Sequence, residues 1–155
     1  DCIRALINNI PIHIRNPLST RPWQHVLEPL GGYLTLAEQL LKDEKKQFTG
    51  AWNFGPSTEA NRTVNELVEK VIGSWGEGRI KKENISVKDF HETNLLHVNS
   101  DKASHTLNWN HQLNFNEAVN TTVAWYKAWL NDENIKNITM QQIQKYQTKL
   151  NKRSM

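Results

Sequence analysis

The side chains that could carry chemistry unaided are few, and their spacing forms no self-sufficient active site. Cys2 is the single cysteine, and a thiol nucleophile needs a base brought beside it in space, which nothing in the sequence marks. The six histidines lack metal-ligand spacings such as H-E-x-x-H, and no C-x-x-C pair is present. No Gly-rich phosphate loop and no G-x-S-x-G turn occurs. We therefore expect no catalytic residue and no metal site in this stretch.

Helices should alternate with short strands along the chain. The patterns predict a helix ending near residue 9, a strand at 10–14, an extended piece at 21–26, a helix across 30–41, a buried strand at 50–55, a helix after Thr63, an irregular stretch with short strands at 79–99, and helices after Ser100, Asn114 and from Thr139. A parallel sheet needs more strands than these and helices on both faces. We therefore expect part of an α/β fold whose remaining strands lie upstream of Asp1.

The helix across 30–41 has one apolar stripe at helical spacing. Its members are Leu30, Tyr33, Leu34, Ala37, Leu40 and Leu41. If strands are missing, apolar faces that they would cover should be exposed, and the separate piece should be poorly soluble. The chain also starts directly with an apolar helical pattern and not with Met, which favours a start inside a larger protein.

Composition limits the class of protein. The chain has 155 residues, of which 37% are hydrophobic and 23% charged, which suits one globular domain and not a disordered chain. The net charge of +3 is scattered, which argues against a nucleic-acid partner but suits a small anionic ligand. No apolar run is long enough to cross a bilayer, so no membrane partner is expected. A lone cysteine fits a reducing compartment, so we expect the cytoplasm.

The most informative stretch is residues 11–41, P-I-H-I-R-N-P-L-S-T-R-P-W-Q-H-V-L-E-P-L-G-G-Y-L-T-L-A-E-Q-L-L. It resembles the substrate-domain signature of the CDP-glucose 4,6-dehydratases, within the extended short-chain dehydrogenase/reductase superfamily. Further matches follow in order: A-W-N-F-G-P (51–56), H-E (91–92), L-N-W (107–109), T-V-A-W-Y-K-A-W (122–129) and T-M-Q-Q-I-Q-K-Y (139–146). Two places depart from the family pattern: Asn108 replaces a usual Gly, and residues 99–101 replace Asp-x-Ser. The resemblance covers almost all of residues 1–148.

The resemblance implies a fold and a domain division. The fold would be α/β, the C-terminal part of an extended short-chain dehydrogenase/reductase (NAD(P)-binding Rossmann-type) fold, mostly helical with a few short strands. Residues 1–148 would form a CDP-sugar-binding domain, and residues 149–155 a disordered basic tail.

The resemblance also implies an activity for the intact protein. This would be the conversion of CDP-glucose to CDP-4-keto-6-deoxyglucose with tightly bound NAD, in surface-polysaccharide (lipopolysaccharide) biosynthesis, by a homodimer or tetramer. The family's Gly-rich NAD turn and its Tyr-x-x-x-Lys pair are absent from this sequence. We therefore expect NAD to be bound by a missing N-terminal half, and these 155 residues alone to be inactive.

By this resemblance, the substrate contacts begin at Arg21, which matches the position that reaches the pyrophosphate. A planar guanidinium suits that role, because it pairs with phosphate oxygens through two hydrogen bonds. Gln24 and His25 would orient Arg21 or bind the ligand, and Trp23 should pack and not stack. The alternative is that Arg21 is a turn residue in solvent.

Three further residues complete the expected CDP-glucose contacts. Asn53 would present its amide to the nucleotide, or else satisfy backbone groups. His91 would donate to phosphate, and Glu92 would accept from a ribose hydroxyl or pair with Arg21.

Two other readings stay open. The chain could be a non-catalytic, truncated binding module, or part of another nucleotide-sugar epimerase or dehydratase of the same superfamily. A Gly-rich turn and a Tyr-x-x-x-Lys pair encoded upstream would favour the dehydratase. The preference for CDP over UDP or dTDP would separate the second alternative.

Overall fold

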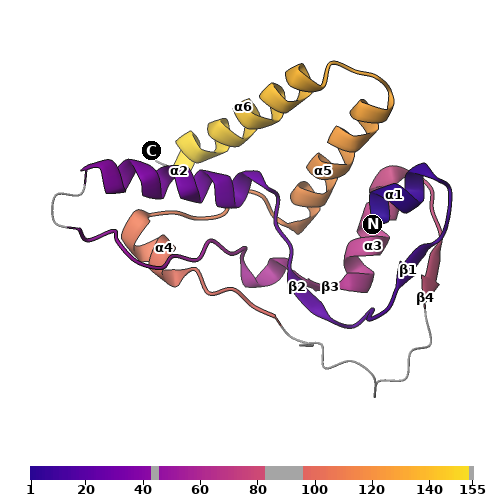
Figure 1. Ribbon diagram of the computed structural model, residues 1–155, viewed down its shortest axis with the longest axis horizontal. Helices are drawn as coiled ribbons and strands as arrows, with labels where there is room; N and C mark the ends of the chain where they lie inside the picture. Colours follow the sequence, from indigo (N-terminus) through magenta and orange to yellow (C-terminus); the bar gives the residue numbers. More distant parts are fainter. Residues whose placement is uncertain (43–45, 83–95, 154–155) are drawn as a thin grey trace.

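The structure is a computed structural model that describes residues 1–42, 46–82 and 96–153 (Figure 1). Its elements, in order, are α1 (Cys2–Ile7), β1 (Ile12–Ile14), β2 (Thr20–Pro22), α2 (Leu27–Lys42), a 3-10 turn (Thr58–Ala60), β3 (Asn61–Thr63), α3 (Val64–Trp75), β4 (Ile80–Lys82), α4 (Asp101–Leu107), α5 (Phe115–Leu130) and α6 (Ile135–Arg153). The mostly helical fold with a few short strands is thus as predicted. No helix in these ranges is long and apolar enough to cross a membrane.

The first core lies between α1, α3 and α5 and a pair of parallel strands. β1 pairs with β4 in parallel, with Ile12 opposite Ile80. Ile12 and Ile14 point into the core beside Val68 of α3 and Val123 of α5, and all four are at most 3% exposed. This parallel sheet has only two strands among the described residues, so the outer edges of β1 and β4 pair with no further strand there. This agrees with the expectation of a partial sheet.

Helix α3 begins where the sequence places it. Thr63 and Glu66 form a capping box: the Glu66 amide donates to Thr63 Oγ1 (3.1 Å), and the Thr63 amide donates to Glu66 Oε2 (2.7 Å). The Thr63 amide and the Thr63 hydroxyl both donate to Glu66 Oε2 and, with a smaller contribution from Arg62, lower the pKa of Glu66. Gly76, with φ of 108°, ends the helix in the left-handed conformation.

The second core lies between α2 and α4. Phe54, Leu107 and Trp109 are buried there, with Ala103 fully enclosed. Gly32 of α2 permits this packing, because a Cβ at that position would lie 2.3 Å from the ring of Phe54. The antiparallel pair of β2 and β3 links the two cores.

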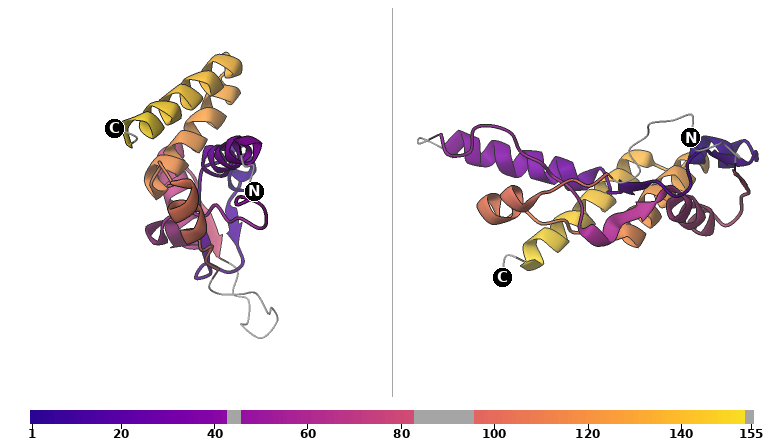
Figure 2. Two further views of the ribbon diagram at one scale, coloured as in Figure 1. Left: turned by 90° about the vertical axis from the view of Figure 1, so that its left-hand side faces the viewer. Right: turned by 90° about the horizontal axis from the view of Figure 1, so that it is seen from below.

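The hairpin of α5 and α6 returns to α2. Figures 1 and 2 show the two helices antiparallel. The hydroxyl of Tyr146 on α6 donates to the Glu28 carboxylate on α2 over 2.9 Å. The chain therefore closes on itself at the start of α2.

Three sequence predictions are wrong: the start of α6, the end of α6, and the strand at 50–55. Helix α6 begins at Ile135 and not at Thr139, because Asn134 Oδ1 accepts the Asn137 amide (3.0 Å). It continues to Arg153, so residues 149–153 are helical and not a disordered tail; Lys149 pairs with Glu117. The strand expected at 50–55 is absent, since residues 51–57 pair with no strand, although 54–56 are buried.

The backbone conformation of Asn108 explains why asparagine can stand where the family pattern has glycine. It follows α4 with φ of 53° and ψ of 27°, the left-handed conformation. Glycine adopts this conformation freely, and asparagine tolerates it better than other residues with side chains. The replacement of Gly by Asn therefore keeps the helix end intact.

Candidate functional site

Arg21 lies in the middle of β2, opposite Arg62 of β3. Its side chain is half-buried, and Nη1 donates to the Thr20 carbonyl over 2.8 Å. Trp23 Nε1 donates across the strand pair to the Arg62 carbonyl (2.9 Å). The strand pair thus fixes the backbone that carries the predicted pyrophosphate-binding side chain.

Gln24 ties this segment to the A-W-N-F-G-P segment. Its Nε2 donates to the Phe54 carbonyl over 3.0 Å, and its Oε1 is buried without a hydrogen-bond partner in the described part of the chain. The ring of Phe54 contacts Tyr33 and Trp109 edge to face, with centroids 5.5 and 5.1 Å away. Asn53, which directly precedes Phe54 in the chain, is exposed. The hydrogen bond from Gln24 therefore helps to fix the position of the backbone that carries Asn53.

His25 is buried, with 6% of its surface exposed. Its Nδ1 accepts the Leu27 amide at 3.3 Å, which satisfies a backbone donor at the start of α2. Burial lowers the pKa of His25, so the imidazole is neutral at pH 7. A neutral ring that accepts at Nδ1 carries its proton on Nε2.

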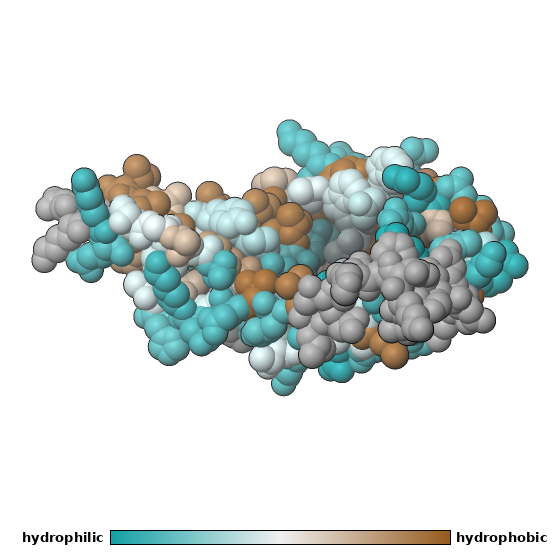
Figure 3. Space-filling model, turned by 60° about the horizontal axis from the view of Figure 1, so that its bottom comes forward, coloured by the Kyte–Doolittle hydropathy of each residue, from teal (hydrophilic) through white to brown (hydrophobic). Residues whose placement is uncertain are grey.

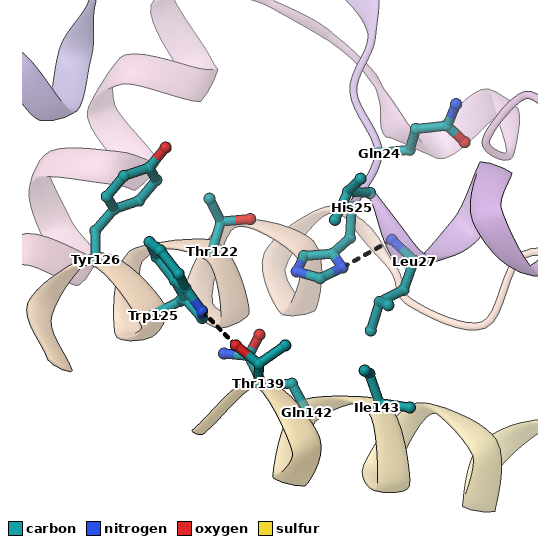
Figure 4. A pocket seen from close by; sticks show the side chains of 10 residues that line it. Gln24, His25, Leu27, Thr122, Trp125, Tyr126, Thr139, Gln142 and Ile143 are labelled. Carbon is teal, nitrogen blue, oxygen red and sulfur yellow. Dashed lines mark hydrogen bonds between the residues drawn. The ribbon is translucent and has the colours of Figure 1, made fainter. Parts of the chain in front are cut away.

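The side chains of Gln24 and His25 border a pocket between the start of α2 and the α5–α6 hairpin (Figure 4). Its volume is about 400 Å³. Trp125 forms one wall, and its Nε1 donates to Thr139 Oγ1 over 2.9 Å. The pocket is lined by Gln24, His25, Val26, Leu27, Thr122, Trp125, Tyr126, Thr139, Gln142 and Ile143. Arg21 and Asn53 are not among its lining residues, so the structure does not bring the predicted ligand contacts into one pocket.

His91 and Glu92 lie outside the described residues. The chain is described again from Leu96, whose carbonyl accepts from the Asn61 amide (3.1 Å) when that side chain is oriented with nitrogen toward it. The same nitrogen then lies 3.2 Å from the Arg21 carbonyl. Leu96 therefore lies close to β2, next to the backbone of Arg21.

Glu28 is a positioning residue that the sequence did not reveal. Its carboxylate is 1% exposed and accepts the backbone amides of Gln112 (2.9 and 3.0 Å) and Leu113 (2.6 Å), besides the Tyr146 hydroxyl. Burial, followed by the Glu28 charge, raises the pKa of Tyr146. Glu28 fixes three segments together beside the pocket. The only local signal was a carboxylate at the apolar start of a helix.

No metal site is present in the described ranges, where no three His, Cys, Asp or Glu side chains group together. The thiol of Cys2 packs against the first core, and burial raises its pKa. A thiol so placed is a poor nucleophile, because the thiolate is the reactive form.

Comparison with solved structures identifies the class of fold. The chain superposes on dTDP-glucose 4,6-dehydratase from Bacillus anthracis, solved in complex with NAD, with a TM-score of 0.63 and 18% identity, over 88% of this chain and 40% of that one. The chain therefore shares the fold of part of that dehydratase, which agrees with the mostly helical α/β fold expected from the sequence.

The sequence match is more particular. The chain is 37% identical over 149 residues to CDP-glucose 4,6-dehydratase of Salmonella typhimurium, which covers 94% of this chain and 40% of the relative. The resemblance to CDP-glucose 4,6-dehydratases is thereby confirmed. The chain spans 40% of the length of the curated relative that it matches. No protein-family model matches it.

Proposed function

We propose that this chain supplies the CDP-sugar-binding part of an NAD-dependent CDP-glucose 4,6-dehydratase. The observation that carries the proposal is the 37% identity to the Salmonella enzyme across 94% of the chain. The reaction would yield CDP-4-keto-6-deoxyglucose for surface-polysaccharide synthesis, in the cytoplasm, in a homodimer or tetramer of the intact protein. These last points follow from the resemblance.

Arg21 is the residue proposed to bind the pyrophosphate of CDP-glucose. Its half-buried position on a paired strand supports this role, since a guanidinium with restricted motion loses less entropy when it forms paired hydrogen bonds. Asn53 is exposed on the segment that Gln24 anchors, where its amide can meet the nucleotide. His25 acts through the backbone at the start of α2, and His91 and Glu92 remain candidates for phosphate and ribose.

NAD does not fit the residues present. The seven glycines form no G-x-G-x-x-G turn between a strand and a helix, and the short parallel pair of β1 and β4 leads into no such turn. NAD would supply the acceptor for the sugar's hydride, and it would have to be held by the part of the relatives to which this chain has no counterpart. The chain's own share is to bind and orient the sugar nucleotide.

The proposal is tested by measuring nucleotide binding with calorimetry. CDP-glucose should bind more tightly than UDP-glucose or dTDP-glucose. Arg21→Met should weaken CDP-glucose binding about tenfold or more, because a hydrogen bond to a charged group contributes roughly 1.5–3 kcal/mol. Arg62→Met is the matched control, since Arg62 lies directly opposite on β3 and pairs with Glu66. Equal binding of the three nucleotides would favour another enzyme of the superfamily.

The alternative of a non-catalytic binding module is favoured by the absence of the NAD turn and the Tyr-x-x-x-Lys pair. The 155 residues alone should show no turnover of CDP-glucose with added NAD. Turnover by the separate chain would contradict the proposed division of labour.

A further inference from the structure

The proposed function assigns no ligand to the pocket between the start of α2 and the α5–α6 hairpin. Its volume of about 400 Å³ suits a small organic molecule, and neither Arg21 nor Asn53 lines it. Figure 4 shows His25, Trp125 and Ile143 directed toward the same space from the segment before α2, from α5 and from α6. Apolar side chains are also exposed on the face shown in Figure 3. An open surface imposes little shape on a ligand, whereas a pocket enclosed by three segments does.

The pocket offers no charge to a ligand. Its ten lining residues include no Lys, Arg, Asp or Glu. The His25 imidazole is neutral at pH 7, because burial lowers its pKa. A phosphate, carboxylate or ammonium group that entered the pocket would lose water without gaining an opposite charge, which is unfavourable. The lining therefore selects an uncharged ligand.

One lining side chain carries a hydrogen-bond donor that has no partner in the described part of the chain. The Leu27 amide donates to His25 Nδ1 over 3.3 Å, so the imidazole proton is on Nε2. Nε2 makes no hydrogen bond to a described residue, although only 6% of His25 is exposed. In Figure 4 this nitrogen lies on the side of the ring away from Leu27, toward Trp125. A buried donor that faces a pocket favours a ligand with an acceptor atom at that point.

The wall opposite His25 is an aromatic ring held in place by its neighbours. Trp125 Nε1 donates to Thr139 Oγ1 over 2.9 Å, and the ring of Tyr126 contacts the indole edge to face, with centroids 5.2 Å apart. An indole fixed in this way loses little side-chain entropy when a ligand binds. Aromatic rings pack well against one another, so this wall favours a planar ring. Ile143 adds apolar surface from α6.

We propose that this pocket is a binding site for an uncharged, planar heteroaromatic molecule, which packs against Trp125 and accepts a hydrogen bond from His25 Nε2. A ring nitrogen or a ring carbonyl oxygen supplies the acceptor. The bound molecule connects the α5–α6 hairpin to the segment that precedes α2. The inference rests on the lining residues and does not depend on the proposed function.

The test compares two fused-ring probes of the same shape, isoquinoline and naphthalene, added to the 155-residue chain at pH 7. Both are uncharged at this pH, and only isoquinoline has an acceptor, its ring nitrogen. Nuclear magnetic resonance of the six indole N–H groups follows binding, and Trp125→Phe identifies the Trp125 signal. Isoquinoline should shift this signal and bind about two- to tenfold more tightly than naphthalene, the contribution of one hydrogen bond.

Two substitutions separate the hydrogen bond from the shape of the pocket. His25→Asn keeps an acceptor for the Leu27 amide, because an asparagine side-chain oxygen can cap the start of a helix, but it removes the Nε2 donor. This variant should bind the two probes equally. Ile143→Trp fills the pocket and should weaken the binding of both probes about tenfold or more. Its control is Gln144→Trp, an exposed position on the same helix, which should bind as the wild type does.

Three results would overturn the proposal. The first is that isoquinoline leaves the Trp125 signal of the wild-type chain unshifted. The second is equal affinity of the wild-type chain for both probes, and the third is a preference for isoquinoline that survives His25→Asn. The first two are read without a substitution in the protein that binds, so they do not depend on a variant that folds. All three are read without CDP-glucose or NAD, so the proposed function can fail or hold separately.

Discussion

Replacing Glu28 with alanine should be the most destabilising single change beside the pocket. The substitution leaves two backbone amides, of Gln112 and Leu113, and the Tyr146 hydroxyl without their acceptor. A buried donor without a partner costs about 1–3 kcal/mol. The amides are only partly buried, so water can reach them after the change. We therefore take the lower end of this range for each of the three donors and expect a loss of about 3 kcal/mol in the free energy of unfolding.

Urea denaturation followed by tryptophan fluorescence measures this loss. Tyr146→Phe removes one of the three donors and should cost about 0.5–1.5 kcal/mol. The double variant should lose less than the sum of the two single losses, because the residues share a hydrogen bond. Glu38→Ala, an exposed carboxylate on the same helix, is the control and should change little. If Glu28→Ala shifted the midpoint no more than Glu38→Ala does, the role assigned to this carboxylate would be wrong.

Three further outcomes follow from particular contacts. Asn108→Ala should lower the free energy of unfolding by about 1 kcal/mol and Asn108→Gly should not, because alanine resists the left-handed conformation; urea denaturation of both decides. Thr63→Ala should cost about 1 kcal/mol at pH 7 by the loss of a helix cap. The pKa of Glu66 is lowered in the folded state, so the ionised carboxylate stabilises the folded protein above its ordinary pKa of 4.5. This stabilisation is lost as the pH falls through the folded pKa. The cost of Thr63→Ala should therefore be smaller in acid than at pH 7. The Tyr146 phenol, whose pKa is raised, should ionise only at higher pH than a free tyrosine, and the difference between wild-type and Tyr146→Phe ultraviolet titrations up to pH 10 should be absent.

The elements that the sequence predicted well are those defined by local signals. The capping box at Thr63 and Glu66 satisfies amides within one turn, so α3 could be placed from four residues. The prediction of a strand at 50–55 was wrong because a strand needs hydrogen bonds to a second strand, and residues 51–57 pair with no strand among the described segments. Helix α6 was started late because Thr139 resembles a cap, whereas Asn134 makes the capping bond.

Contacts far apart in the sequence were beyond such reasoning. Glu28 binds partners 84, 85 and 118 residues away, and no local pattern records them. The apolar stripe of α2 and the exposure of some apolar face were expected from the sequence. Which face would be exposed was not, because periodicity shows that a face is apolar and does not say what covers it. The separation of Arg21 and Asn53 from the pocket of Gln24 and His25 likewise appears only in three dimensions.

The most direct test of the central claim is the dehydratase activity of a fusion that places the non-matching part of the Salmonella relative before Asp1. Mass spectrometry follows the loss of water from CDP-glucose. We predict turnover that Arg21→Met lowers about tenfold or more and that Arg62→Met leaves intact. A folded fusion that retains NAD and binds CDP-glucose but releases no water would contradict the claim that this chain is the CDP-sugar part of a dehydratase.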